Sequence, residues 1–535
     1  MPCPPLSPNE EYFLFPEANV RVTRSFPNEA RSESVVVANP KNDQNLICTS
    51  KKFINPDLYH GTISTSFSFD GGKSWTESEP AREAGWDGMT DPDLTFDAAG
   101  NAYLIVEPLQ YPHPVPGDIV TIGLYVYKST DGGRTWNTPV QLHLNRTDDK
   151  QWIEADTSWT SPHQGAVYAV WGAFTPLRFA RSLDQGATWQ GAGGAASGSD
   201  ITVEQIHAPS LAIGDDGTIH VTWLVPFSTE VKYVRSTDGG NTFSPVMTVA
   251  SGITDLHSSL PRVDGFPQFE FNSFRVMTLV TSCMAAGNRL IVAWADFRER
   301  VSRIYYRIGS NGGTTWLGPA GGQPLLTLPS DPAQHHFHPH LALTGLGAIG
   351  CAYYDYGLKK EQAKLIDVHV TFSCDDGDSF HVPSTITDHP WDPMLNPPFS
   401  RGVSQVKFIG EYFGFCGVGN AFGAVWTDTR TGYQELFYDH VGIRGMTPMY
   451  ARIAPAVVDV LAGVVQDGGG LVYAGGKIVR IPPLDPWLDV LHALVAIDAV
   501  KNIRDPAAHR AIAALQHVIV SVAQHELDAG AESHE

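Results

Sequence analysis

The chain has 535 residues, and its 57 acidic side chains outnumber 36 basic ones to give a formal net charge of −21. This excess argues against nucleic acid and anionic membranes as partners, and no apolar run is long enough to span a bilayer. Residues 1–5 lack the basic start and apolar core of a signal peptide, so we expect a cytoplasmic protein or a chain whose leader has been removed.

The cysteines are scattered and form no CxxC pair, which argues against a zinc site and against a dense disulfide framework. We expect them to be buried thiols in strands. They are Cys3, Cys48, Cys283, Cys351, Cys374 and Cys416.

An N-terminal extension, residues 1–17, precedes a segment in which one turn motif recurs. The pattern S-x-D-x-G-x-[ST]-[WF] matches five times between residues 18 and 445, and a sixth copy is degenerate because Asn311 replaces its aspartate. The aspartate positions lie 53 to 73 residues apart, a period that suits one four-stranded propeller blade with its loops. The copies run from Ser68 to Trp75, Ser129 to Trp136, Ser182 to Trp189, Ser236 to Phe243, Gly309 to Trp316 and Ser373 to Phe380.

Each copy makes physical sense as a hairpin turn. The aspartate can accept hydrogen bonds from backbone N–H groups ahead of it, the glycine allows positive φ, and the closing aromatic ring packs under the hairpin. The motifs resemble the Asp-box (BNR) repeats of the sialidase-like β-propeller superfamily. The resemblance covers residues 18–445 and implies a propeller; because the boxes are structural in that superfamily, they do not indicate a function.

In chain order, we expect an all-β propeller of seven four-stranded blades, with six blades as the alternative. The segment Asn19–Thr23 has strand alternation and could complete the last blade, which would close the ring and pair its exposed edges. The blades should begin near Ser34, Asp91, Gln151, Gln205, Phe269, His336 and Gly410.

From residue 446 the composition changes to alanine-, valine- and leucine-rich stretches with helical periodicity. Asp485-Pro486 and Asp505-Pro506 each supply an N-cap and a first helical residue, and Leu471–Val479 suggests a small hairpin. We therefore predict a helical C-terminal subdomain over residues 446–535. It would pack on the ring or join copies of the chain into a homo-oligomer.

In a propeller, the starts of the innermost strands and the loops between second and third strands share one face around the central channel. Polar and aromatic side chains at these positions should therefore converge on that face. The candidate catalytic residues are Asp91, Glu411, Tyr412 and His338. The candidate substrate-binding residues are Trp152, His207, Asp296, Arg298, His340, Tyr354, Asp355, Asp428 and Arg430.

The pattern W-x-D-x-R occurs twice, at residues 294–298 and 426–430. One interpretation is an arginine that binds an anionic or hydroxyl-rich ligand while the neighbouring carboxylate holds it in place. The alternative is a structural Asp–Arg brace that fixes a loop to the next blade.

Clustered carboxylates, tyrosines and tryptophans on one face suit chemistry on a glycan. We therefore predict a carbohydrate-active enzyme, foremost a glycoside hydrolase that acts at the channel mouth. The sialidase resemblance implies Tyr412 as a nucleophile activated by Glu411, with Asp91 as the acid. Adjacent strand residues point to opposite faces, however, so both could face the channel only at a bulge. The family's F-R-I-P motif, which supplies an arginine, is absent at Val20–Thr23.

Two alternatives remain open. His207, His338 and His340 with an arginine neutraliser have the residue types of a polysaccharide lyase. The same histidines could ligate a divalent metal, although we predict no cofactor. The second alternative is a non-catalytic propeller that serves as a binding platform.

Overall fold

The computed structural model describes residues 3, 6, 11–23, 29–115, 117–271, 273–326, 334–358, 363–401, 403–446, 471–474 and 477–480. The chain divides into two compact units, one comprising Met1–Cys3 and Leu14–Gly442, the other Pro4–Phe13 and Ile443–Glu535. In the second unit, β35 (Leu471–Ala474) pairs antiparallel with β36 (Lys477–Arg480), and the predicted helices lie outside the described residues. Among the described residues, no helix has the length and apolar character needed to cross a membrane.

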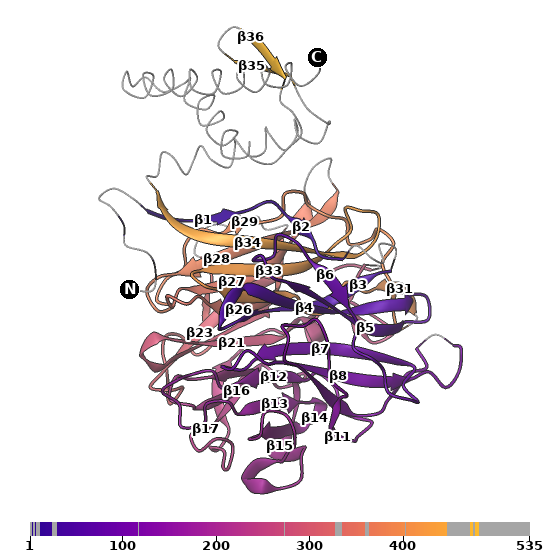
Figure 1. Ribbon diagram of the computed structural model, residues 1–535. Helices are drawn as coiled ribbons and strands as arrows, with labels where there is room; N and C mark the ends of the chain where they lie inside the picture. The colour runs from indigo at the N-terminus through magenta and orange to yellow at the C-terminus, as the bar shows by residue number, and fades with distance from the viewer. Residues whose placement is uncertain are drawn as a thin grey trace, which may run out of the picture. The chain divides into compact units, whose positions relative to one another are not determined.

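The first unit consists almost wholly of antiparallel sheets that the chain forms one after another, which fits a β-propeller (Figure 1). The first sheet contains β3 (Arg31–Asn39), β4 (Asn42–Asn55), β5 (His60–Ser68) and β6 (Thr76–Ser78). The second contains β7 (Gly88–Phe96), β8 (Ala102–Gln110), β10 (Leu124–Ser129) and β11 (Val140–His143), with β9 (Val120–Thr121) paired to β8.

A seven-stranded sheet follows, and it joins two meanders because β15 is shared between them. Its strands are β12 (Trp152–Ala155), β13 (Val167–Trp171), β14 (Ala173–Ser182), β15 (Ser199–Ile213), β16 (Ile219–Leu224), β17 (Glu230–Ser236) and β18 (Met247–Ser251). The part of β15 before His207 pairs with β14, and the part after it pairs with β16.

The remaining sheets of the first unit repeat the same plan. One contains β21 (Val280–Ala285), β22 (Arg289–Asp296), β23 (Arg303–Ser310) and β24 (Thr315–Trp316), with β25 (Gln323–Pro324) on β23. The next contains β26 (His335–Leu343), β27 (Ile349–Leu358), β28 (Lys364–Ser373) and β29 (Ser384–Thr385). The last has the order β1 (Glu11–Pro16), β34 (Glu435–Met446), β33 (Ala421–Asp428) and β32 (Gly414–Val418), with β2 (Val20–Arg21) also paired to β34.

Short elements complete the described chain. They are η1 (Ala192–Gly194), α1 (Leu256–Ser259), β19 (Arg262–Val263), β20 (Phe266–Pro267), η2 (Ala286–Asn288), β30 (Phe399–Ser400) and β31 (Val403–Lys407). We expected a strand to begin near Phe269. The structure has isolated β-bridges at Gln268 and Phe274 in this region, and the strand β21 begins only after them.

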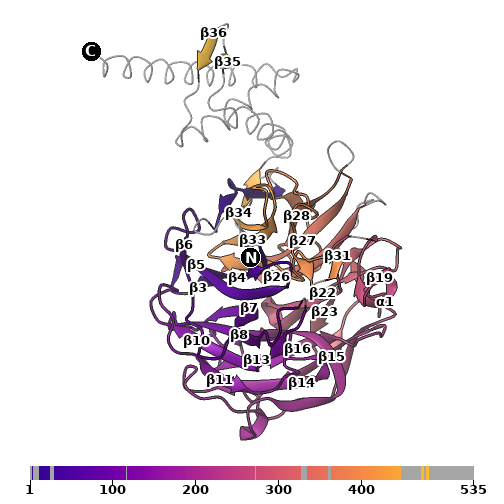
Figure 2. The same ribbon diagram turned by 90° about the vertical axis from the view of Figure 1, so that its right-hand side faces the viewer.

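The core lies between neighbouring sheets. A fully buried tryptophan near the end of β13, β16, β22 and β33 fills the space at the same place in successive meanders, where its large apolar area stabilises the stack. These side chains are Trp171, Trp223, Trp294 and Trp426. In both views the successive sheets follow the chain around the unit, and β33 lies close to β4 (Figure 2).

The innermost strand of each meander contacts the next one, and β32 contacts β3. These strands are β3, β7, β12, β15, β21, β26 and β32. Register shifts interrupt β3, β7 and β26 near their starts and β15 just after His207, which marks these places as bulges. Left-handed backbone occurs there or just before the strand, at Glu33 (φ 53), Asp91 (φ 45), Lys150 (φ 57), Ala208 (φ 47), His338 (φ 48) and Gly410 (φ 92).

The recurring turn is held by the same hydrogen bonds in five copies. In the second copy, Asp131 Oδ1 accepts from Ser129 Oγ at 2.8 Å and from the Thr135 backbone N–H at 3.0 Å, while Asp131 Oδ2 accepts from Thr135 Oγ1 at 2.6 Å. The degenerate copy has Gly309 in place of the serine and a left-handed Asn311 (φ 50), so it lacks the hydroxyl and the carboxylate of this network.

Two cysteines differ from the sequence expectation. Cys3 and Cys374 form a disulfide across 371 residues of chain, so the expectation of thiols is wrong for this pair. Cys48, Cys283 and Cys351 are buried free thiols, and Cys416 is half-buried and free.

Candidate functional site

The starts of the innermost strands bring together a cluster of buried charged and polar side chains, here called the central cluster. The bulges and left-handed residues turn these side chains out of the regular strand alternation. Each side chain is exposed by no more than one tenth of its surface. The central cluster consists of Glu33, Asp91, Lys150, His207, Arg275, His338 and Glu411, one residue from each successive innermost strand or the segment just before it.

Glu411 is held by two cations in the centre of this cluster. Lys150 Nζ pairs with Glu411 Oε2, and Arg275 Nε lies 2.7 Å from Glu411 Oε1. Complete burial alone would raise the pKa of Glu411, but Arg275 and Lys150 outweigh it and lower that pKa to about 2. Glu411 is therefore ionised, and each of its oxygens is paired with a cation. These contacts suit a role in positioning Lys150 and Arg275.

Lys150 also reaches Asp91, with Nζ 3.1 Å from Asp91 Oδ2, and lies 3.9 Å from Glu33 Oε1. Burial and the charge of Asp91 raise the pKa of Glu33 to about 8, against the influence of Lys51. Lys51 Nζ is 3.8 Å from Glu33 Oε2 and lies 4.1 Å from the centre of the Tyr59 ring. Each cation thus has a carboxyl partner.

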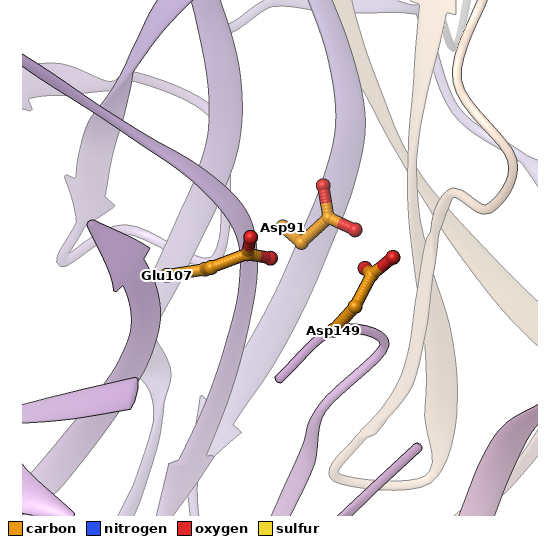
Figure 3. A group of neighbouring side chains, drawn as sticks. All are labelled: Asp91, Glu107 and Asp149. Atoms are coloured by element: carbon orange, nitrogen blue, oxygen red, sulfur yellow. The ribbon is translucent and has the colours of Figure 1, made fainter. Parts of the chain in front are cut away.

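Asp91 belongs at the same time to a group of three carboxyls, in which the side chains of Asp91, Glu107 and Asp149 point toward one another (Figure 3). One oxygen from each lies within 4.8 Å of the others. Burial, reinforced by the neighbouring aspartates, raises the pKa of Glu107 well above its ordinary value, and Thr121 Oγ1 donates a hydrogen bond to it.

The two aspartates of this group shift in opposite directions. Burial raises the pKa of the half-buried Asp149, and Asp91 adds to that effect although Lys150 opposes it. Burial would also raise the pKa of Asp91, but Lys150 and Lys51 together with hydrogen bonds hold it far below its ordinary value. The pKa values of these two neighbouring carboxyls are therefore shifted apart by their surroundings.

The histidines divide into two environments. Burial lowers the pKa of His207 and of His338 to about 3, so both imidazoles are neutral near pH 7. Within the described structure, neither ring nitrogen of His338 has a hydrogen-bond partner. His340 Nδ1 instead donates a 2.8 Å hydrogen bond to the Phe413 carbonyl, and the ring centre of His340 lies 5.7 Å from that of Trp152. Among described residues, His207, His338 and His340 do not form a group with metal-ligand spacing.

Tyr412 follows Glu411 in the segment just before β32. Its hydroxyl donates to the Pro92 carbonyl at 3.2 Å, and burial raises its pKa well above the ordinary value. Two candidate residues lie within strand β27 and in other surroundings. Tyr354 stacks on Phe413 at 4.5 Å, and Asp355 lies 3.5 Å from both His336 and His369.

The two W-x-D-x-R patterns have matching contacts. Asp296 accepts from Trp294 Nε1 at 3.1 Å and from the Arg298 backbone N–H at 3.0 Å, and it pairs with the Arg298 guanidinium. Arg298 Nη2 also donates to the Gly321 carbonyl at 2.8 Å.

In the second copy, Asp428 accepts from Trp426 Nε1 at 3.2 Å and from Arg430 Nε at 3.0 Å. Arg430 also pairs with Asp388 and donates to Asn19 Oδ1 at 3.1 Å. Both arginines thus bridge segments of the protein, which are the contacts of a brace.

The sequence indicated Asp91, His207, His338 and Glu411 because they stand at strand starts. It missed Lys150 and Arg275. Lys150 directly precedes Gln151, where a strand was expected to begin. Its position next to a strand start could therefore have indicated Lys150 as a candidate site residue. Arg275 lies in the irregular stretch before β21, where the expected strand start was about ten residues too early.

No protein-family model and no curated protein matches this sequence. Among solved structures, a protein of unknown function from Dyadobacter fermentans is 15% identical with a TM-score of 0.43, and the alignment covers 68% of this chain and 99% of that one. The NanB sialidase of Streptococcus pneumoniae is 10% identical with a TM-score of 0.41, covering 68% of each chain. An α-L-arabinofuranosidase of Fusarium graminearum is 12% identical with a TM-score of 0.36, covering 79% of this chain and 97% of that one.

Proposed function

We propose that this protein is a glycoside hydrolase in which Asp149 is the general acid and Asp91 is the ionised partner. The observation that supports this proposal is the pair of neighbouring carboxyls whose pKa values are shifted in opposite directions. Glycosidases assign acid and nucleophile by this kind of environmental difference. We also infer that the ring has seven blades and that β2 completes the last, because Val20 pairs with Tyr438 on β34.

The separation of the two carboxyls favours retention of configuration. Oxygens of Asp91 and Asp149 lie within 4.8 Å, close to the ~5–5.5 Å typical of retaining enzymes and shorter than the ~6.5–9.5 Å that leaves room for water in inverting ones. Asp149 would protonate the leaving oxygen while Asp91 attacks the anomeric carbon. Water, deprotonated by Asp149, would then release the sugar from Asp91.

The cations of the central cluster support this assignment and restrict the charge that the bound sugar can carry. Lys150 holds Asp91 ionised, and Glu411 holds Lys150 in place. Because Lys150 and Arg275 both pair with the ionised Glu411, neither cation of the cluster is reserved for a substrate carboxylate. We therefore propose a neutral sugar at the point of cleavage.

A polysaccharide lyase is the second candidate, and His338 is the observation that favours it. This imidazole is neutral, makes no hydrogen bond within the described structure, and lies close enough to Arg275 and Lys150 for their charges to lower its pKa. In a β-elimination, such a base removes the proton next to a uronate carboxylate that a cation neutralises. The leaving oxygen then departs and a carbon–carbon double bond forms.

One experiment separates the two candidates. The wild type, Asp149→Asn and His338→Asn are assayed on neutral aryl glycosides, sialosides and uronate polysaccharides, with reducing ends and absorbance of unsaturated uronate followed together. Asparagine suits position 338 because it tolerates left-handed backbone. A hydrolase gives reducing ends without new absorbance and loses activity in Asp149→Asn alone. New absorbance that disappears in His338→Asn would contradict the hydrolase and support the lyase.

A further inference from the structure

Two exposed phenylalanines lie beside the central cluster and form, with His257, what we call the aromatic platform. Phe174 is at the start of β14 and Phe227 is in the turn between β16 and β17. Their ring centres are 5.9 Å apart with nearly parallel planes, at an angle of 26°. The His257 ring, on α1, lies 5.8 Å from Phe174 and 4.9 Å from Phe227. Three separate segments thus converge on one small surface.

The platform is exposed and its backbone is strained, a combination that folding alone does not favour. Phe174 is 40% exposed and Phe227 is 59% exposed, so neither ring contributes fully to the core. Both residues have left-handed backbone, with φ 60 at Phe174 and φ 55 at Phe227. A bulky side chain seldom adopts this conformation, and such outliers gather at ligand-binding positions.

The platform adjoins the central cluster through His207. The ring centre of Phe174 is 5.0 Å from that of His207, and His207 is 6.1 Å from His257. Arg262 borders the other side, with its guanidinium carbon 5.7 Å from the centre of the Phe227 ring and Nη2 3.2 Å from His257 Nε2. Apolar ring faces are therefore edged by hydrogen-bonding groups.

We propose that Phe174 and Phe227 form a subsite that stacks on the apolar face of a pyranose ring, next to the sugar bound at the central cluster. Arg262 and His257 would hydrogen-bond to the hydroxyls of the stacked sugar. A small apolar surface with polar groups at its edge suits a sugar ring, which has an apolar face and a polar rim. This inference rests on the proposed function, since it assigns the substrate a second sugar.

The test measures binding of cellopentaose, xylopentaose and mannopentaose by saturation-transfer NMR and titration. Each is measured with the wild type and with an Asp149→Asn variant that is expected not to consume the ligand. The platform is removed by the double substitution Phe174→Gly and Phe227→Gly, because glycine accepts left-handed backbone and the fold should persist. Trp159→Ala is the matched control, since Trp159 is 86% exposed and lies in the turn between β12 and β13.

We expect at least one pentasaccharide to bind to the wild type with transfer from aromatic protons, and its Kd to rise about tenfold or more in the double variant. Trp159→Ala should leave the Kd unchanged. An unchanged Kd in a folded double variant, or no binding of any of the three probes to the wild type, would overturn the subsite. If Asp149→Asn keeps full turnover while the platform result holds, the proposed catalytic pair fails and the subsite stands.

Discussion

Asp91 and Asp149 illustrate how surroundings decide the role of a side chain. The two carboxyls are neighbours, yet Lys150 and Lys51 keep Asp91 ionised while burial raises the pKa of Asp149. Activity should need both states at once. We therefore expect kcat/KM to fall at high pH as Asp149 loses its proton, while Asp91 adds no acid limb in the accessible range because Lys150 and Lys51 hold its pKa far below the ordinary value. A profile without an alkaline decline would argue against Asp149 as the acid.

His338 makes a prediction about stability. Its pKa falls from 6.5 when exposed to about 3 in the folded protein, so between these values the unfolded chain binds a proton that the native protein does not. The wild type should therefore lose stability relative to His338→Asn as pH falls below 6.5.

The comparison with the variant is needed because carboxyls with raised pKa values, such as Glu33, act in the opposite direction. Urea unfolding at pH 7.5 and 5.5 should show a drop about 1.4 kcal/mol larger in the wild type than in His338→Asn. Equal drops in both proteins would mean that His338 is not buried in its neutral form.

Part of the candidate site could be predicted from the residue types at strand starts. This reasoning indicated Asp91, His207, His338 and Glu411. What the sequence does not show is which side chains face each other. The bulge near Asp91 and the left-handed Lys150 change the direction of these side chains, and both depend on how neighbouring strands pair. Glu107 and Asp149 come together only through such pairing.

At the scale of elements, the repeated turn was predictable because its hydrogen bonds lie within eight residues of chain. Asp131, for example, needs only Ser129 and Thr135. Asp131→Ala should lower the free energy of unfolding by about 1 kcal/mol, because it removes these bonds from an exposed turn. Turnover should not change; a loss of activity without a loss of stability would give the turn a functional role.

The W-x-D-x-R element should act as a brace. Asp428 is completely buried and accepts bonds from Trp426 and Arg430, so Asp428→Asn should cost about 3 kcal/mol of folding free energy. Arg298→Ala and Arg430→Ala should likewise lower the Tm and leave KM for a glycan unchanged. A raised KM at an unchanged Tm would restore the alternative interpretation, in which these arginines bind substrate.

At the scale of the whole molecule, the sequence period predicted successive antiparallel meanders, since each meander is local. The disulfide between Cys3 and Cys374 was not predictable, because nothing in the spacing of cysteines 371 residues apart shows that they meet. The extent of the C-terminal helical subdomain, residues 446–535, stays a prediction, as does its part in self-association.

The disulfide carries a prediction of its own. Linking Cys3 to Cys374 restricts almost the whole unfolded chain, so its removal should cost up to about 4–5 kcal/mol. Cys3→Ser and Cys374→Ser should lower the Tm equally, and the double variant should lower it no further. Additive losses would mean that the two thiols stabilise the protein separately and are not bonded.

The most direct test of the account compares the wild type with Asp149→Asn on phenyl and 2,4-dinitrophenyl glycosides of the same neutral sugar. Phenol leaves well only when it receives a proton, whereas dinitrophenol leaves without one. If Asp149 is the acid, the substitution should slow the phenyl glycoside by about 10²–10⁴-fold and hardly affect the dinitrophenyl glycoside. The exposed Asp215→Asn is the control and should change neither rate. Equal losses on both substrates, or no loss on either, would contradict the assignment of Asp149 as the general acid.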